Sequence, residues 1–288
     1  MVNWPNFVAQ AFNGLVLGAL LALISSGLTI IYGTLGVLNL AHGAMFMLGG
    51  YAGWIAYSYT HSFIVAVIAG SLFVMVVGVV MERGIIRHFY KRPHEDQLLV
   101  TFGLGIVLVE LVRFIFGSLS KSVAAPSLFA GITKLGFMFY PTYRLALLGI
   151  VAVALVALYI VLYRTRIGMI VRAGVDDRDI LAAMGVRVQV VFVLVFALGA
   201  GLAGIAGVVG GTFQSISPGE DTRFLLASLV VVIVGGMGSI PGAALGALII
   251  GLAEQLGSVY IPTYAIVITF LIMVLVLALR PQGLLARR

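Results

Sequence analysis

Charged side chains are scarce in this chain. Only 9% of its 288 residues are Asp, Glu, Lys or Arg, whereas ordinary soluble domains carry about 25%. Residues 1–81 contain none at all. A chain this apolar cannot cover itself with a polar surface, which excludes a soluble globular domain and indicates a protein whose solvent is the lipid bilayer.

Cysteine and catalytic motifs are also missing. Without cysteine, neither disulfides nor thiolate-bound metal can form. The chain has no phosphate loop of the form G-x4-G-K-S/T, so we do not expect it to hydrolyse ATP itself. It has no H-E-x-x-H or other metal-spaced cluster either. We therefore predict no catalytic residue, metal or cofactor in this chain, which argues against a membrane enzyme.

Long uncharged runs predict the fold class. They cover 1–81, 145–163, 188–219, 224–253 and 255–279, and a bilayer-spanning helix needs roughly 20 apolar residues. The runs are continuous rather than alternating, which favours helices over a β-barrel. We predict an all-α, polytopic transmembrane helical bundle forming a single domain over 1–288. About nine helices are expected, with eight to ten compatible, at 8–32, 36–58, 63–81, 98–117, 144–163, 190–212, 222–238, 241–257 and 263–279.

The basic residues predict the topology. Twelve of the 17 lie in three segments, 83–92, 164–187 and 280–288, and Lys and Arg concentrate in cytoplasmic loops. We therefore expect these segments and the C-terminus in the cytoplasm, and the loops 118–143 and 213–223 outside, in a bacterial inner membrane. The N-terminus is then outside, unless the first apolar run hides a re-entrant helix. This distribution argues against nucleic-acid binding despite the net charge of +7.

Two glycine-rich segments resemble each other. Residues 33–39 read GTLGVLN and residues 235–241 read GGMGSIP; each follows an apolar run and leads into a helix rich in small residues. Transporters built from two related halves often line their site with Gly- or Pro-broken helices at matching positions. Two tight helix–helix turns are the alternative. We predict broken or re-entrant helices near 33–43 and 235–242, with pathway residues Asn39, His42, Gly43, Gly235, Gly236, Gly238, Ser239 and Pro241.

Polar residues inside the apolar runs are few, and each predicts a role. Asn39 and His42 are three apart and would share one face of a regular helix. Since polar groups facing lipid are costly, we expect both to line or brace a path. Glu110 and Arg113, also three apart, are expected to pair with each other, and a structural role is favoured for Glu254.

The segment 164–187 is the longest charged, amphipathic stretch. Acidic residues, Asp177 and Asp179 among them, precede a good helix former, and acids complement the start of a helix. Gly185 can stop such a helix. The segment is either a docking helix for a partner or a solvated connecting loop.

Several blocks together resemble one transporter family. They are NGLVLGALLAL at 13–23, IYGTLGVLNLAHG at 31–43, APSLFAG at 125–131, RIG at 166–168 with AAMGV at 182–186, GGMGSIPGA at 235–243 and RPQGLL at 280–285. In this order they resemble the branched-chain amino acid ABC transporter permeases of the LivH type, over nearly the whole chain. One departure is Ala44, where many relatives carry an acid after the His-Gly pair.

The resemblance implies the membrane-spanning permease subunit of an ATP-driven importer that works by alternating access. Its partners would be a second related permease, two cytoplasmic ATPases that carry ATP and Mg²⁺, and a periplasmic solute-binding protein. It also implies that the loop at about 164–189 receives the ATPase, through Asp177, Asp179, Ala182, Ala183 and Gly185. A permease for urea, short amides or other amino acids stays open. So does a stand-alone secondary transporter or channel, which would need an ion site at Glu110 or Glu254.

Overall fold

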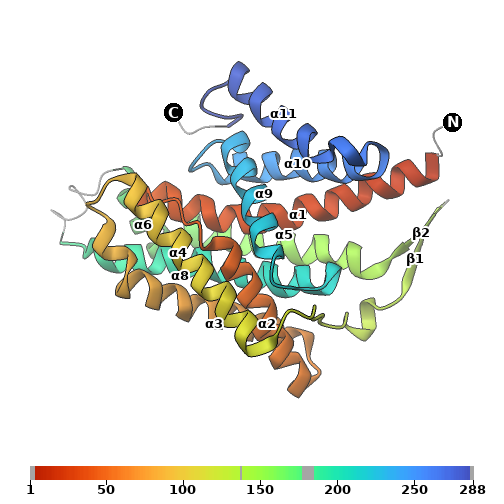
Figure 1. The fold of residues 1–288 in the computed structure, drawn as a ribbon, viewed down its shortest axis with the longest axis horizontal. Helices are drawn as coiled ribbons and strands as arrows, with labels where there is room; N and C mark the ends of the chain where they lie inside the picture. The colour runs from red at the N-terminus through yellow and green to blue at the C-terminus, as the bar shows by residue number, and fades with distance from the viewer. Residues whose placement is uncertain (1–3, 137, 177–184, 286–288) are drawn as a thin grey trace.

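The computed structural model describes residues 4–136, 138–176 and 185–285, and the chain is almost entirely helical (Figure 1). The helices are α1 (Trp4–Leu35), α2 (His42–Thr60), α3 (Phe63–Gly84), α4 (His94–Phe116), α5 (Thr142–Arg164), α6 (Arg166–Asp176), α8 (Val188–Gln214), α9 (Glu220–Gly235), α10 (Ile240–Tyr260) and α11 (Ala265–Leu279). Two short strands, β1 (Ile132–Leu135) and β2 (Met138–Pro141), form an antiparallel hairpin. Single 3-10 turns lie at Ile86–Phe89, Ser127–Phe129 and Pro262–Tyr264.

Helix α1 is the central element. It is buried along most of its length and packs against α10 and α8. A side chain on Gly18 would meet the α10 backbone at Ala247 O, only 2.9 Å away, and one on Gly14 would meet Leu252 Cα at the same distance. Small residues on the facing surfaces therefore let α1 and α10 approach closely, which is how helices associate where lipid supplies no hydrophobic driving force.

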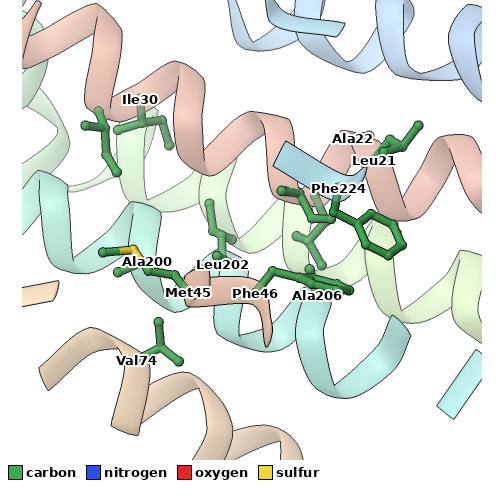
Figure 2. Close-up of a cluster of buried hydrophobic side chains, with 14 of the residues drawn as sticks. Leu21, Ala22, Ile30, Met45, Phe46, Val74, Ala200, Leu202, Ala206 and Phe224 are labelled. Atoms are coloured by element: carbon green, nitrogen blue, oxygen red, sulfur yellow. The ribbon is translucent and has the colours of Figure 1, made fainter. Parts of the chain in front are cut away.

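The core is formed by apolar side chains from α1, α2, α3, α8 and α9 (Figure 2). Phe46 of α2 and Phe224 of α9 lie with their ring centroids 4.3 Å apart. Glycines again permit the contact between α2 and α8, since a Cβ atom on Gly50 would lie 3.0 Å from the carbonyl oxygen of Gly207. The core thus holds the start of α2 and the start of α9 against each other.

One end of the bundle is formed by the β-hairpin and the segments that meet it, and we call it the hairpin end. There, Tyr140 of β2 donates a hydrogen bond to Asn13 near the N-terminus (2.8 Å). Lys121 and Ile216 exchange backbone hydrogen bonds there. The loops expected outside, 118–143 and 213–223, therefore meet. Figure 1 shows the N-terminus and the hairpin together at the right.

The opposite end, which we call the basic end, gathers the described parts of the three basic segments. Arg83 and Arg87 share a pocket with Gln189 at the start of α8. Leu285 of the C-terminal segment shares another with Arg172 of α6. The described parts of these segments, 83–92, 164–176, 185–187 and 280–285, thus lie on one side of the bundle, as the charge pattern predicts.

The predicted fold class is confirmed. Each of the nine expected helices has a counterpart, with α6 and the hairpin as additions. Among the described residues, seven helical segments are long and apolar enough to cross a membrane; α2 and α9 are not among them. Helix α1 ends at Leu35 and α9 ends at Gly235. Both breaks therefore occur where the glycine patterns predicted them.

Candidate functional site: two helix breaks that meet

The first break is residues 36–41, which leave α1 and re-enter the bundle. Gly36 adopts φ +68°, a backbone conformation that glycine reaches without steric cost. Six residues later, the His42 ring donates from Nε2 to the carbonyl oxygen of Ile24 (3.0 Å). At about 1.5 Å per residue, Ile24 lies about 16 Å back along α1 from Leu35. Helix α2 therefore begins deep inside the bundle rather than at its end.

Side chains satisfy the polar backbone of this first break. The Thr101 hydroxyl of α4 accepts a hydrogen bond from Leu40 N–H (3.2 Å), and its oxygen lies 3.3 Å from the Leu38 carbonyl oxygen. Asn39 Oδ1 accepts from Ala41 N–H (3.1 Å). An irregular backbone at membrane depth is tolerated only where protein or water supplies such partners. Thr101 is a site residue that sequence reasoning missed, because nothing local links α4 to residues 38–40.

Asn39 and His42 do not share a face of one helix. Asn39 lies in the irregular segment, and His42 is the first residue of α2. Both side chains are fully buried. The His42 ring lies over Gly27 of α1, where a Cβ atom would be 3.1 Å from the ring. Among the described residues, His42 Nδ1 has no hydrogen-bond partner. In this conformation both residues brace the first break.

Gly43 brings the starts of two helices together. A Cβ atom at Gly43 would overlap the backbone carbonyl of Asp221, in the first turn of α9. The starts of α2 and α9 therefore touch backbone to backbone, and a side chain at residue 43 would push them apart.

The second break is residues 236–239, between α9 and α10. Gly236 and Gly238 have φ values of +107° and +85°. Ser239 then caps α10, because its hydroxyl accepts a hydrogen bond from Gly242 N–H (3.2 Å). Pro241 occupies the first turn of α10, where its missing N–H is not needed. The local sequence thus ends one helix and starts the next within four residues.

The two segments predicted as breaks, 33–43 and 235–242, lie against each other. A Cβ atom on Gly33, at the end of α1, would lie 3.2 Å from Gly238 Cα. The two segments whose sequences resemble each other are therefore neighbours at the basic end. An internal repeat would explain this arrangement and stays a prediction.

A cavity of about 240 Å³, which we call the break cavity, opens beside this contact. From the predicted pathway set, Gly238, Ser239 and Pro241 line it. Its other walls come from the end of α1, from α5 and α6, and from the C-terminal segment: Thr29, Ile30, Gly33, Thr34, Leu162, Tyr163, Val171, Arg172, Ile240 and Leu285. Asn39, His42, Gly43, Gly235 and Gly236 do not line it. The predicted set is thus divided between this cavity and the buried start of α2.

The C-terminal segment caps α9, a contact that sequence reasoning missed. Leu284 N–H donates to Val234 O (2.9 Å), and Leu285 N–H donates to Gly235 O (3.0 Å). These are carbonyls that the end of a helix otherwise leaves without partners. Gly283, with φ +89°, makes the turn that brings the segment back. The glycine of RPQGLL indicates a turn after the last helix, but the sequence does not show that this turn brings the chain back to α9.

The predicted coupling residues fall mostly outside the described part of the chain. Asp177, Asp179, Ala182 and Ala183 belong to that undescribed segment. Gly185 has φ +80°, and a Cβ atom there would meet nothing within 4 Å. The residues just before the segment form α6, an 11-residue helix at the basic end.

Charged groups in the apolar runs are paired. Arg113 and Glu110 form the predicted ion pair at 2.6 Å, at the surface of α4. Glu254 pairs with Arg223 at 2.9 Å, and Arg223 also lies 3.5 Å from Glu220. Within the described ranges no three His, Asp or Glu side chains gather as metal ligands would.

Comparisons with known proteins agree with the sequence blocks. The family model described as "Branched-chain amino acid transport system / permease component" matches residues 10–277. The LivH permease protein of the high-affinity branched-chain amino acid transport system of Escherichia coli K12 is 34% identical, covering 98% of this chain and 96% of its own. The LivM permease protein of the same organism is 24% identical, covering 99% and 72%.

A more distant relative and one solved structure extend the match. A probable LivH-type permease of Methanocaldococcus jannaschii is 28% identical over 94% of this chain and 90% of its own. Among solved structures, PsaBC from Streptococcus pneumoniae in complex with Fab superposes with a TM-score of 0.51 and 13% identity, covering 94% of this chain and 91% of that chain. At that identity the likeness concerns the fold alone.

Proposed function

Because the chain belongs to the family of branched-chain amino acid transport permeases, we propose that it is the membrane-spanning subunit of an ATP-driven importer of branched-chain amino acids. The observation that carries the proposal is a match over nearly the full length of both chains to permeases of that transport system. Its function is solute passage, and ATP with Mg²⁺ belongs to partner ATPase subunits. The proposed location is the bacterial inner membrane.

The proposed partners are a second permease of the same family, two cytoplasmic ATPases and a periplasmic solute-binding protein. The occurrence of LivH and LivM permease proteins in one organism supports a pair of related permeases. The basic end is the cytoplasmic one, because Lys and Arg concentrate in cytoplasmic loops. The C-terminus is then cytoplasmic, and the hairpin end faces the solute-binding protein.

Alternating access would act through the two breaks. An ATPase that closes on the coupling loop at about 164–189 would push on α6, which lines the break cavity beside Gly238 and Ser239. Because Gly33, in the last turn of α1, contacts Gly238 of the second break there, a shift of α6 would act on the second break and on the end of α1 that leads into the first break. The break cavity beside Gly238 would then open toward the cytoplasm, while the path past the start of α2 would close toward the outside. ATP can drive this step only if the ATPases prefer one of the two states.

Two alternatives predict different measurements. A permease for urea or short amides would have the same partners but another solute. A stand-alone secondary transporter or channel would need an ion site at Glu110 or Glu254, and both are already paired with arginines.

The test is uptake of radiolabelled leucine into proteoliposomes that contain this chain with its permease and ATPase partners. We expect uptake to require internal ATP and external solute-binding protein, and to be inhibited by excess valine or isoleucine but not by urea. If urea inhibits uptake and valine and isoleucine do not, the importer belongs to the urea and short-amide class instead. Uptake by this chain alone, driven by an ion gradient, would refute the ATP-driven importer.

A further inference from the structure

A second and larger cavity lies between α4 and α9. It has a volume of about 550 Å³, within the range of about 300–1,000 Å³ typical of small-molecule sites. We call it the α4–α9 groove. Leu40 and Ala44, which flank Asn39 and His42, line it together with the two helices.

The lining of the groove separates into a charged end and an apolar end. On α4, Phe102 and Ile106 precede Glu110 by two turns and one turn, on the same face of the helix. On α9, the order is reversed, because Asp221 comes first and Leu225 and Leu229 follow at successive turns; all of these residues line the groove.

Both charged ends point the same way. Helix α9 starts just after Ile216, which pairs with Lys121 at the hairpin end, and the loop that contains Lys121 follows the end of α4. The groove therefore offers charges toward the hairpin end and hydrocarbon toward the basic end.

This arrangement matches the chemistry of one solute class. The Arg113 guanidinium can bind a carboxylate, and the Asp221 carboxylate, which accepts from Gly219 N–H (2.9 Å) and from the Thr222 hydroxyl (3.2 Å), can also bind an ammonium group. The Arg113 side chain is 45% accessible although it pairs with Glu110, so the carboxylate of a zwitterion can reach it. The leucines of α9 and the Phe102 and Ile106 side chains of α4 then suit a branched hydrocarbon chain.

The groove is also connected to the first break. A Cβ atom on Gly105, in the wall of the groove, would lie 3.3 Å from Ala41 Cα. Asp221 contacts Gly43 through its backbone carbonyl. A movement of α2 against α9 therefore changes the shape of the groove, as a site that opens and closes in a transport cycle requires.

We propose that the α4–α9 groove is this chain's half of a solute site for an α-amino acid with a branched apolar side chain. The groove is open on one side, where Phe102, Ile106 and Leu226 are each about half exposed. The inference rests on the proposed function, because a partner must complete the site. The second permease subunit supplies the missing wall. The solute enters with its charged head between Arg113 and Asp221.

The test uses the absence of cysteine from this chain. Single cysteines are placed in the groove (Ile106→Cys and Leu229→Cys) in the full complex, whose other subunits are made free of accessible thiols. Leu119→Cys is the matched control, because Leu119 is 77% exposed in the loop just after the same helix and outside the groove, where a charged reagent can reach it from water. A small charged thiosulfonate reagent measures the rate of modification with and without leucine.

We expect leucine to slow modification severalfold at both groove positions and not at Leu119, while glycine protects less. Arg113→Gln should remove the protection at Ile106→Cys, and Arg113→Lys should restore part of it. Equal rates with and without leucine, or no modification in any nucleotide state, would overturn the proposal; the second result would mean that a partner helix fills the groove. Leucine uptake by the unmodified complex separates the two hypotheses, because intact uptake without protection refutes the groove alone.

Discussion

Replacing Gly238 tests whether the second break depends on backbone conformation or on space. Gly238 has φ +85°, and a Cβ atom there would lie 3.5 Å from Gly33 Cα, which is an ordinary van der Waals contact. Crowding by the first side-chain atom is therefore a small contribution. The main cost is the left-handed backbone, about 1–2 kcal/mol for an ordinary L-residue and more for a β-branched one.

The magnitude predicts an order among three variants. Asn tolerates the left-handed region better than other residues with a side chain, so Gly238→Asn should retain the most transport. Gly238→Ala should lose about 1–2 kcal/mol from the state that needs this conformation, which is about tenfold in its population. Gly238→Val should stop transport while lowering membrane abundance less.

Two measurements check the order: the initial rate of ATP-dependent leucine uptake, and the amount of each variant in the membrane by quantitative immunoblot. Gly242→Ala is the contrasting control, because its Cβ atom would overlap the carbonyl group of Gly235 and should reduce abundance as well. If Gly238→Asn is as inactive as Gly238→Val, or if abundance falls in step with transport for all three variants, the backbone argument is wrong and plain packing replaces it.

Three further predictions concern the coupling loop, the first break and the C-terminal segment. Charge reversal at Asp177 or a bulky residue at Gly185 should leave the chain inserted but separate ATP hydrolysis from uptake; normal transport by both variants would contradict an ATPase-receiving role. Cysteines at Asn39 and His42 should react with a small polar thiol reagent only in some nucleotide states, since both are fully buried here; no reaction in any state with uptake intact would remove them from the pathway. Leu284→Pro deletes an N–H that caps α9 and should cost about 0.5–1.5 kcal/mol of stability, measured as a lower midpoint of thermal unfolding, whereas Leu284→Ala keeps the N–H and should cost less.

Part of the candidate site could be predicted because its signals are local. Glycine with proline or serine ends one helix and starts another within a few residues, so 33–43 and 235–242 were identifiable as breaks. A spacing of three residues on one helix was enough to predict the Glu110–Arg113 pair, which the structure confirms. The expectation that Asn39 and His42 share a helix face depended on a regular helix through 36–41. That segment is irregular: the chain leaves α1 at Gly36, and Thr101 and Asn39 accept hydrogen bonds from its backbone.

The sequence by itself determined that the chain is a membrane protein, that it is helical, and that its basic segments share one end of the bundle. Hydropathy and charge act on each segment independently of its neighbours, so these properties can be read one segment at a time. Only the tertiary structure decided which segments meet. The chain contains 36 glycines, and any two small-residue surfaces can pack closely, so composition does not identify Gly238 as the partner of Gly33. The same holds for His42 on Ile24 and for the C-terminal segment on α9, because a backbone carbonyl is available at every residue and only the packed bundle determines which one is within reach.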